Sequence, residues 1–183
     1  EIERLTRLVE GLDQLARGEH GERNGASAEV DLAGIVRRSV ELISPDLAKR
    51  RIEVVIDDAT SVPAIHGDPD AMGQVVANLV QNAARYTNDG GTIRVRLRAD
   101  GEWLHFAIAN TGSEIPAAEL PLIWERLHRV DRSRARASGG AGIGLAIVRQ
   151  IIEAHGGKVG ATSANGRTEV WFRLPAATVP VRG

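Results

Sequence analysis

The chain has 183 residues, of which 43% are hydrophobic and only 3% aromatic, so we expect one medium-sized domain with an aliphatic core and an appendage. Its formal net charge of −1 gives no reason to expect nucleic acid or an acidic membrane surface as a partner. The lack of cysteine excludes disulfide scaffolds and thiolate metal sites, and no apolar run approaches the roughly 20 residues of a membrane span.

Residues 1–18 are predicted to be the C-terminal part of a bundle helix. Apolar residues recur there at spacings of three and four, as in the seam of a short coiled coil. They are Ile2, Leu5, Val9, Leu12 and Ala16. So short a seam is unstable alone, and we expect the chain to be a piece of a longer protein. An ordinary amphipathic helix is the alternative. Residues 19–29 carry no large apolar side chain and are expected to be a linker.

Residues 30–176 are predicted to form one folded domain, followed by a frayed tail at 177–183. Asp68 and Pro69 suit the start of a helix, and Asp100-Gly101 suits a hairpin turn. The elements expected in chain order are helix 31–49, strand 51–57, edge strand 62–66, a helix after Asp68, strands 92–98 and 103–109, short helix 118–127, helix 142–155 and strands 158–163 and 169–174.

This order of elements lacks the regular strand–helix alternation of a parallel sheet. We therefore expect an α/β fold of the α+β kind. It should be a two-layer sandwich, in which helices cover one face of a mixed, mostly antiparallel sheet.

The helical stretch 73–87 has an unusual polar face. At about 100° per residue, its apolar residues fall on one side, and the opposite side carries carboxamides where a solvated face would carry charges. That polar side consists of Gln74, Asn78, Gln81, Asn82, Arg85 and Tyr86. Such a face is typical of a surface that meets a ligand.

Two glycine-containing segments are further candidates for a ligand site. Residues 139–145, GGAGIGL, lead into a helix, and helix N-termini bind phosphate through free N–H groups. The spacing fits neither a Rossmann fingerprint nor a Walker loop. Residues 109–116, ANTGSEIP, form a polar turn where a strand is expected to end. Each segment alone is also typical of a simple loop or turn.

Taken together and in this order, the three segments resemble the N, G1 and G2 boxes of the GHKL ATP-binding (Bergerat) fold. They are most similar to the catalytic domain of two-component sensor histidine kinases. Residues 122–129 resemble a degraded F box, with Trp124 and Leu127 at its aromatic positions. The resemblance covers essentially the whole chain.

The resemblance implies a function and its partners. The domain would bind ATP and Mg²⁺ and donate the γ-phosphate to a histidine on its own dimerisation domain, for relay to a response regulator. It would be the cytoplasmic domain of a homodimeric parent anchored in a bacterial membrane.

The resemblance also implies roles for individual residues. Asn82 matches the metal ligand, Asn78 supports it, Arg85 meets phosphate, and Tyr86 lies along the adenine. The other implied nucleotide contacts are Asn110, Gly112, Ile115, Gly140, Ala141, Gly142, Ile143, Gly144, Leu145 and Thr168. One or two of the loop arginines are expected to reach the γ-phosphate; these are Arg126, Arg129, Arg132, Arg134 and Arg136.

Two residues depart from the family pattern. Asn110 stands where the family has an aspartate that accepts from the adenine amino group, and the lost charge assistance is worth about 1 kcal/mol. Glu114 replaces a glycine, which stiffens the turn and crowds the pocket. We therefore predict weaker nucleotide binding than in a typical family member.

Other functions remain open at this point. GHKL ATPases of the gyrase, Hsp90 or mismatch-repair type resemble this chain, but they carry a glutamate base at the position of Asn78. An anti-sigma serine kinase and a degenerate nucleotide-binding scaffold are further alternatives. None of the five histidines lies on a helix with an acidic residue after it, so the phosphoacceptor is expected outside this chain.

Overall fold

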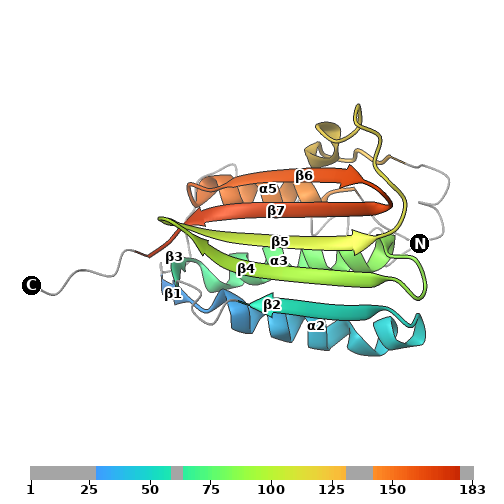
Figure 1. Ribbon diagram of the computed structural model, residues 1–183. Helices are drawn as coiled ribbons and strands as arrows, with labels where there is room; N and C mark the ends of the chain where they lie inside the picture. The colour runs from blue at the N-terminus through green and yellow to red at the C-terminus, as the bar shows by residue number, and fades with distance from the viewer. Residues whose placement is uncertain (1–27, 59–63, 131–141, 178–183) are drawn as a thin grey trace, which may run out of the picture.

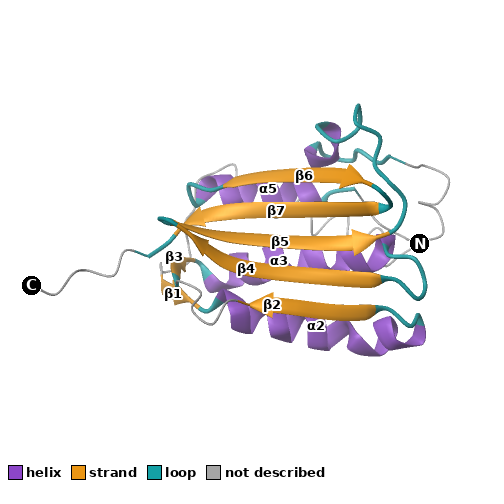
Figure 2. Ribbon diagram, viewed as in Figure 1, coloured by secondary structure: helices purple, strands orange, loops and turns teal. Residues whose placement is uncertain are grey.

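In the part of the chain that the structure describes, the fold has two layers, with three helices covering one face of a five-stranded sheet (Figures 1 and 2). A computed structural model describes residues 28–58, 64–130 and 142–177. The elements are β1 (Ala28–Val30), α2 (Leu32–Lys49), β2 (Glu53–Asp58), β3 (Ile65–Gly67), α3 (Pro69–Tyr86), β4 (Thr92–Asp100), β5 (Trp103–Thr111), the 3-10 turn η1 (Leu122–Trp124), α5 (Gly144–Ala154), β6 (Lys158–Ala164) and β7 (Arg167–Pro175).

The main sheet has the strand order β2-β4-β5-β7-β6. β2 runs parallel to β4, and the other three pairs of neighbours are antiparallel. The expected two-layer sandwich with a mixed, mostly antiparallel sheet is therefore confirmed. α3 contacts both α2 and α5, so it is the central helix of the second layer.

α3 begins where the sequence predicts. The Asp68 carboxylate accepts hydrogen bonds from the backbone N–H groups of Asp70 at 2.9 Å and Ala71 at 3.3 Å, and Pro69 occupies the first turn. The apolar side of the helix is buried; its members are Met72, Val75, Val76, Leu79, Val80 and Ala83. Burial of this side turns the carboxamide side away from the core.

The alternating strands place one set of side chains in the core. Phe106 of β5 and Phe172 of β7 are paired across the sheet and stack with ring centroids 4.7 Å apart. Both rings are fully buried between sheet and helices. This central stack fixes the middle of the sheet, while the strand ends extend to the polar segments described below.

The N-terminal boundary of the domain differs from the expectation. The sequence predicts a linker at Ala28 and Glu29, but both residues lie in β1, which pairs antiparallel with β3 in a separate two-stranded sheet. The edge strand predicted at 62–66 is observed at 65–67. Three-residue strands carry too little alternation to be located from sequence, because pairing partners far along the chain define them.

Two predicted helices are also corrected. Residues 118–127 contain only turns and the 3-10 turn η1, in place of the short helix expected there. The last helix starts at Gly144, two residues later than expected, because Gly142 has a φ of +71°. That left-handed conformation is incompatible with an α-helix.

The two ends of the chain lie largely outside the described ranges. The bundle helix expected at 1–18 and most of the linker fall in the undescribed N-terminus. At the other end, the Ala177 N–H donates to the Ala64 carbonyl at 2.8 Å, so the first residue of the expected tail is held against the domain. Among the helices of the described part, none is long and apolar enough to cross a membrane.

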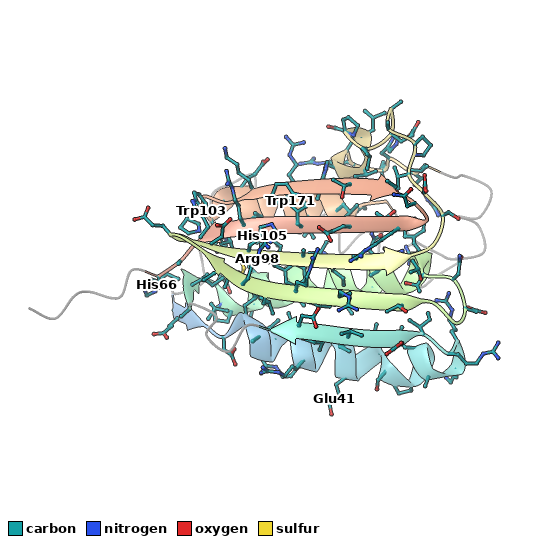
Figure 3. The ribbon with its side chains drawn as sticks, in the orientation of Figure 1. Glu41, His66, Arg98, Trp103, His105 and Trp171 are labelled. Atoms are coloured by element: carbon teal, nitrogen blue, oxygen red, sulfur yellow. The ribbon has the colours of Figure 1, made fainter. Side chains whose placement is uncertain are left out.

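The face of the sheet opposite the helices carries aromatic and basic side chains (Figure 3). His105 stacks on Trp171 with centroids 5.7 Å apart, and the Arg173 guanidinium lies 4.8 Å from the centroid of the Trp103 ring. Partial burial, aided by the positive charge of Arg98, lowers the pKa of His105 below its ordinary value of 6.5.

This shift predicts a pH dependence of stability. Because the folded-state pKa of His105 is lowered, the unfolded chain takes up the proton first as pH falls below about 6.5. Stability from this group is complete above that value and falls as pH descends toward the folded-state pKa. His105→Gln should therefore flatten the decline in the free energy of unfolding between pH 7 and 5, measured by urea titration. An unaltered decline in His105→Gln would contradict this assignment.

Candidate nucleotide-binding site

The C-terminal end of α3 is anchored by a residue that sequence reasoning missed. The Arg50 guanidinium donates to the Ala84 carbonyl at 2.6 Å and to the Thr87 carbonyl, and it pairs with Asp89 at 2.8 Å. A basic residue just after a helix gives no signal that it will reach the end of another helix. These bonds fix the last turn of α3, which carries Arg85 and Tyr86.

The carboxamide face of α3 meets the start of α5. A side chain at Gly144 would place its Cβ 3.4 Å from Asn78 Oδ1, so the first residue of α5 lies directly beside this amide. Asn78 Nδ2 is buried and has no hydrogen-bond partner among the described residues. An unpaired buried donor costs about 1–3 kcal/mol, so this amide is suited to a ligand that accepts its hydrogen bond.

The N-terminus of α5 has no side-chain cap of its own. Its N-cap residue Ile143 is buried, and an isoleucine side chain cannot accept a hydrogen bond from the first-turn N–H groups. Leu145, in the first turn, packs against the core and helps to fix the helix. A helix N-terminus beside an amide-lined helix fits a phosphate-bearing ligand.

Asn82 lies one turn beyond Asn78 on the same face of α3 and is half-buried. Tyr86, one further turn along, has 53% of its surface exposed, which leaves its ring available for stacking. Arg85 is not without an interaction partner. The residues of α3 that are expected to face the metal, the phosphates and the base therefore lie on one side of the helix and at its C-terminal end.

The described ranges contain no cluster of three His, Cys, Asp or Glu side chains that could hold a metal ion. A divalent cation bound through Asn82 would take its other ligands from phosphate and water, as Mg²⁺ does in nucleotide sites. The amide oxygen of Asn82 and the unpaired amide of Asn78 fit a metal–phosphate group of this kind.

The turn after β5 closes against the end of α3. Thr87 and Gly112 form an isolated antiparallel bridge, and the Gly112 N–H donates to the Gly166 carbonyl at 2.9 Å. A Cβ on Gly112 would come within 2.2 Å of the Tyr86 carbonyl oxygen. Glycine is therefore required where the turn, α3 and the β6–β7 hairpin meet.

A buried polar network lies behind this turn. Asn110 and Thr168, paired across β5 and β7, are 6% and 7% exposed. The hydroxyls of Thr168 and Ser163 are 2.8 Å apart, and Ser163 Oγ also accepts the Ile115 N–H at 2.8 Å. Ser163 was not among the predicted site residues, although it is paired with Thr168 in the sheet. Asn110, Ile115 and Thr168, three of the residues predicted to surround the base, therefore lie together here.

Glu114 ties the same turn to the hairpin. Its exposed carboxylate accepts the Gly166 N–H at 2.6 Å. The replacement of a family glycine by Glu114 therefore adds a bond between the turn and the β6–β7 hairpin, in keeping with the expected stiffening. Whether it crowds the pocket stays a prediction.

The loop between η1 and α5 is only partly described. Gly140, Ala141 and three of the five loop arginines (Arg132, Arg134 and Arg136) lie outside the described residues. Gly142, on the α5 side, accepts the Leu127 N–H at 2.9 Å through its carbonyl, so the two ends of the loop are joined.

The two residues at the expected aromatic positions of the F box differ in burial. Trp124 is buried, while Leu127 is 58% exposed with a φ of +63°. Neither Arg126 nor Arg129 is without an interaction partner.

Comparisons with known proteins agree with this geometry. Residues 67–178 match the family model described as histidine kinase-, DNA gyrase B-, and HSP90-like ATPase. The signal transduction histidine-protein kinase/phosphatase MprB of Mycobacterium tuberculosis is 33% identical over 99% of this chain and 36% of its own length. The chain thus spans about a third of the curated relative that it matches.

Two solved structures share the fold. Full-length ShkA in complex with AMPPNP is 30% identical with a TM-score of 0.82, covering 97% of this chain and 37% of that chain. The histidine kinase ThkA in complex with the response regulator protein TrrA is 22% identical with a TM-score of 0.78, covering 96% and 49%. The second likeness shows the fold alone.

The matched family model covers more than half of the chain, and it includes the carboxamide face of α3, the turn after β5 and the start of α5. MprB is a signal transduction histidine-protein kinase/phosphatase, and a solved structure describes mycobacterial MprB as a sensor histidine kinase. The chain therefore belongs to the histidine kinase-, DNA gyrase B- and HSP90-like ATPase family, and within it to the catalytic ATP-binding domains of sensor histidine kinases.

Proposed function

We propose that this chain binds Mg-ATP and donates the γ-phosphate to a histidine on a dimerisation domain, for relay to an aspartate of a response regulator. The proposal rests on the family and on the arrangement of α3, α5 and the turn after β5. It extends to the parent protein, which we expect to be a homodimer anchored in a bacterial membrane. This chain would be the cytoplasmic domain of that parent.

The observation that favours transfer over hydrolysis is Asn78. Its Nδ2 is buried, and its Oδ1 lies beside Gly144, where the nucleotide phosphates are expected. A carboxamide cannot take a proton from an attacking water, so this site lacks the general base that a hydrolase needs at that position. The same amide can donate a hydrogen bond to phosphate.

The remaining roles follow from position. Asn82 would supply one oxygen ligand to Mg²⁺, and Arg85 would offset the charge of the phosphates. Tyr86 would lie along the base at the open end of α3. Phosphoryl transfer depends mainly on positioning and charge stabilisation, and the anchored end of α3 supplies the positioning.

The histidine acceptor is expected on another segment. Of the four described histidines, His105 lies within β5, His66 within β3 and His155 at the end of α5. His128 is held by Glu119, with 2.7 Å between Nε2 and Oε2. None of the four precedes an acidic residue on a helix. The structural neighbour bound to a response regulator supports such a protein as the second partner.

Phosphotransfer in trans tests the proposal. The chain is mixed with Mg²⁺, ATP labelled at the γ-phosphate, and a separately produced dimerisation fragment bearing the acceptor histidine. We expect acid-labile, alkali-stable label on the fragment, and none when its acceptor histidine is replaced by Gln. Labelled phosphate released without labelled fragment would instead indicate an ATPase. Bound ATP with neither transfer nor release would indicate a degenerate scaffold.

A further inference from the structure

The base end of the site contains polar groups but no buried charge. In the described part of the chain, the buried polar side chains are Thr87, Asn110 and Thr168, and none of them is ionisable at neutral pH. The Thr87 hydroxyl is committed to the Ala83 carbonyl at 2.6 Å, inside its own helix. Asn110 and Thr168 therefore remain as the buried groups that can read a base.

The Asn110 amide is weakly held. Its Nδ2 donates to the Thr111 carbonyl at 3.5 Å, which is at the long limit for a hydrogen bond. The position of a Cβ on Gly112, 3.4 Å from Nδ2, is occupied by the Tyr86 carbonyl oxygen, so backbone of α3 lies close to this side of the amide. A hydrogen bond this long opposes only weakly a 180° turn that exchanges Oδ1 and Nδ2.

The hydroxyl pair beside it is equally reversible. Either Thr168 or Ser163 can be the donor across their 2.8 Å contact. Because Ser163 Oγ accepts from the Ile115 N–H, its own proton can go to Thr168, which leaves the Thr168 proton free to donate to a ligand. In the opposite arrangement Thr168 offers a lone pair. The hydroxyl thus presents a donor or an acceptor at little cost.

Side chains that can either donate or accept a hydrogen bond can pair with more than one purine base. The Watson–Crick edge of adenine presents a donor at N6 and an acceptor at N1, while guanine presents an acceptor at O6 and a donor at N1. A carboxamide matches either edge with two hydrogen bonds, whereas a carboxylate accepts only and would repel guanine O6.

We propose that Asn110 relaxes the base selectivity of this site, so that it binds guanosine and inosine triphosphates as well as ATP. The inference rests on the proposed function, because it needs the base to lie against Asn110. It specifies the substrate class as purine nucleoside triphosphates, selected by the flat purine shape more than by the 6-substituent.

The test compares affinities of the 183-residue chain for ATP, GTP, ITP and CTP with Mg²⁺ by calorimetric titration. We expect the dissociation constants for ATP, GTP and ITP to agree within about tenfold, and CTP to bind more weakly. In Asn110→Asp, ATP should bind more tightly, and the preference for ATP over GTP should rise by roughly 10- to 100-fold. The matched control is Asn165→Asp, the same exchange at an exposed turn residue with a φ of +54°, which should leave the preference unchanged.

The outcomes separate the two proposals. Tight ATP binding with GTP more than 100-fold weaker in the natural sequence would overturn the relaxed selectivity and leave the proposed function intact. Equal binding of all four nucleotides would also overturn it, because the base would then not be read. No binding of any nucleotide would overturn the proposed function itself. If Asn110→Asp fails to fold, the comparison of ATP, GTP and ITP in the natural sequence decides alone.

Discussion

Replacing Asn82 by alanine is expected to lower Mg²⁺-dependent phosphotransfer by about two orders of magnitude, because loss of one metal ligand misplaces the phosphates. Asn82 lies half-buried on the polar face of α3, one turn from the unpaired amide of Asn78. ATP binding measured without Mg²⁺ should change little. Titration of Mg²⁺ at fixed ATP, followed by calorimetry and by labelled phosphotransfer, measures both effects.

Gln81→Ala is the matched control for this prediction. Gln81 is the adjacent carboxamide on α3, and it is exposed. Its loss should leave Mg²⁺ dependence and phosphotransfer near their original values, and both variants should unfold at similar temperatures. An Asn82→Ala variant with unaltered Mg²⁺ dependence would show that the metal is held elsewhere.

Gly112→Ala is expected to destabilise the fold by roughly 2–4 kcal/mol and to weaken nucleotide binding at the same time. The new Cβ would lie 2.2 Å from the Tyr86 carbonyl oxygen, a contact with backbone that cannot rotate away. To separate the new Cβ from the Tyr86 carbonyl, the turn after β5 would have to move away from the end of α3. This movement would strain the hydrogen bond from the Gly112 N–H to the Gly166 carbonyl. Urea unfolding and calorimetric titration with ATP measure the two losses.

Gly73→Ala provides the contrast. Gly73 lies inside α3, and a Cβ there meets nothing within 4 Å. The higher helix propensity of alanine should stabilise the protein by about 0.5–1 kcal/mol without altering nucleotide affinity. Equal unfolding midpoints for the two variants would mean that the turn relaxes freely, contrary to the packing described above.

The elements predicted correctly from the sequence are those with local signals. Asp68 and Pro69 mark the start of α3, and the alternation around Asp100-Gly101 marks the β4–β5 hairpin. The polar face of α3 was also visible, because helical periodicity separates it from the buried side without knowledge of any partner. Such features depend on a few consecutive residues and on general stereochemistry.

The errors have a common physical origin. Strand β1 exists through its pairing with β3, more than 30 residues later in the chain, and the segment around η1 is held by contacts with α5. The start of α5 was set two residues too early, because its position depends on the left-handed backbone of Gly142, which carries the acceptor for the Leu127 N–H. Local propensity is too weak to predict structure that such distant contacts define.

The sequence by itself determined the family and the candidate residues of α3, since these depend on residue types at short, regular spacings. Only the tertiary structure decided which groups are available to a ligand. It showed that Asn78 keeps an unpaired buried donor, that Arg50 anchors the end of α3, and that Ser163 shares a reversible hydroxyl pair with Thr168. Hydrogen-bond satisfaction depends on the positions of atoms from segments distant in the chain, which residue identity and spacing do not specify.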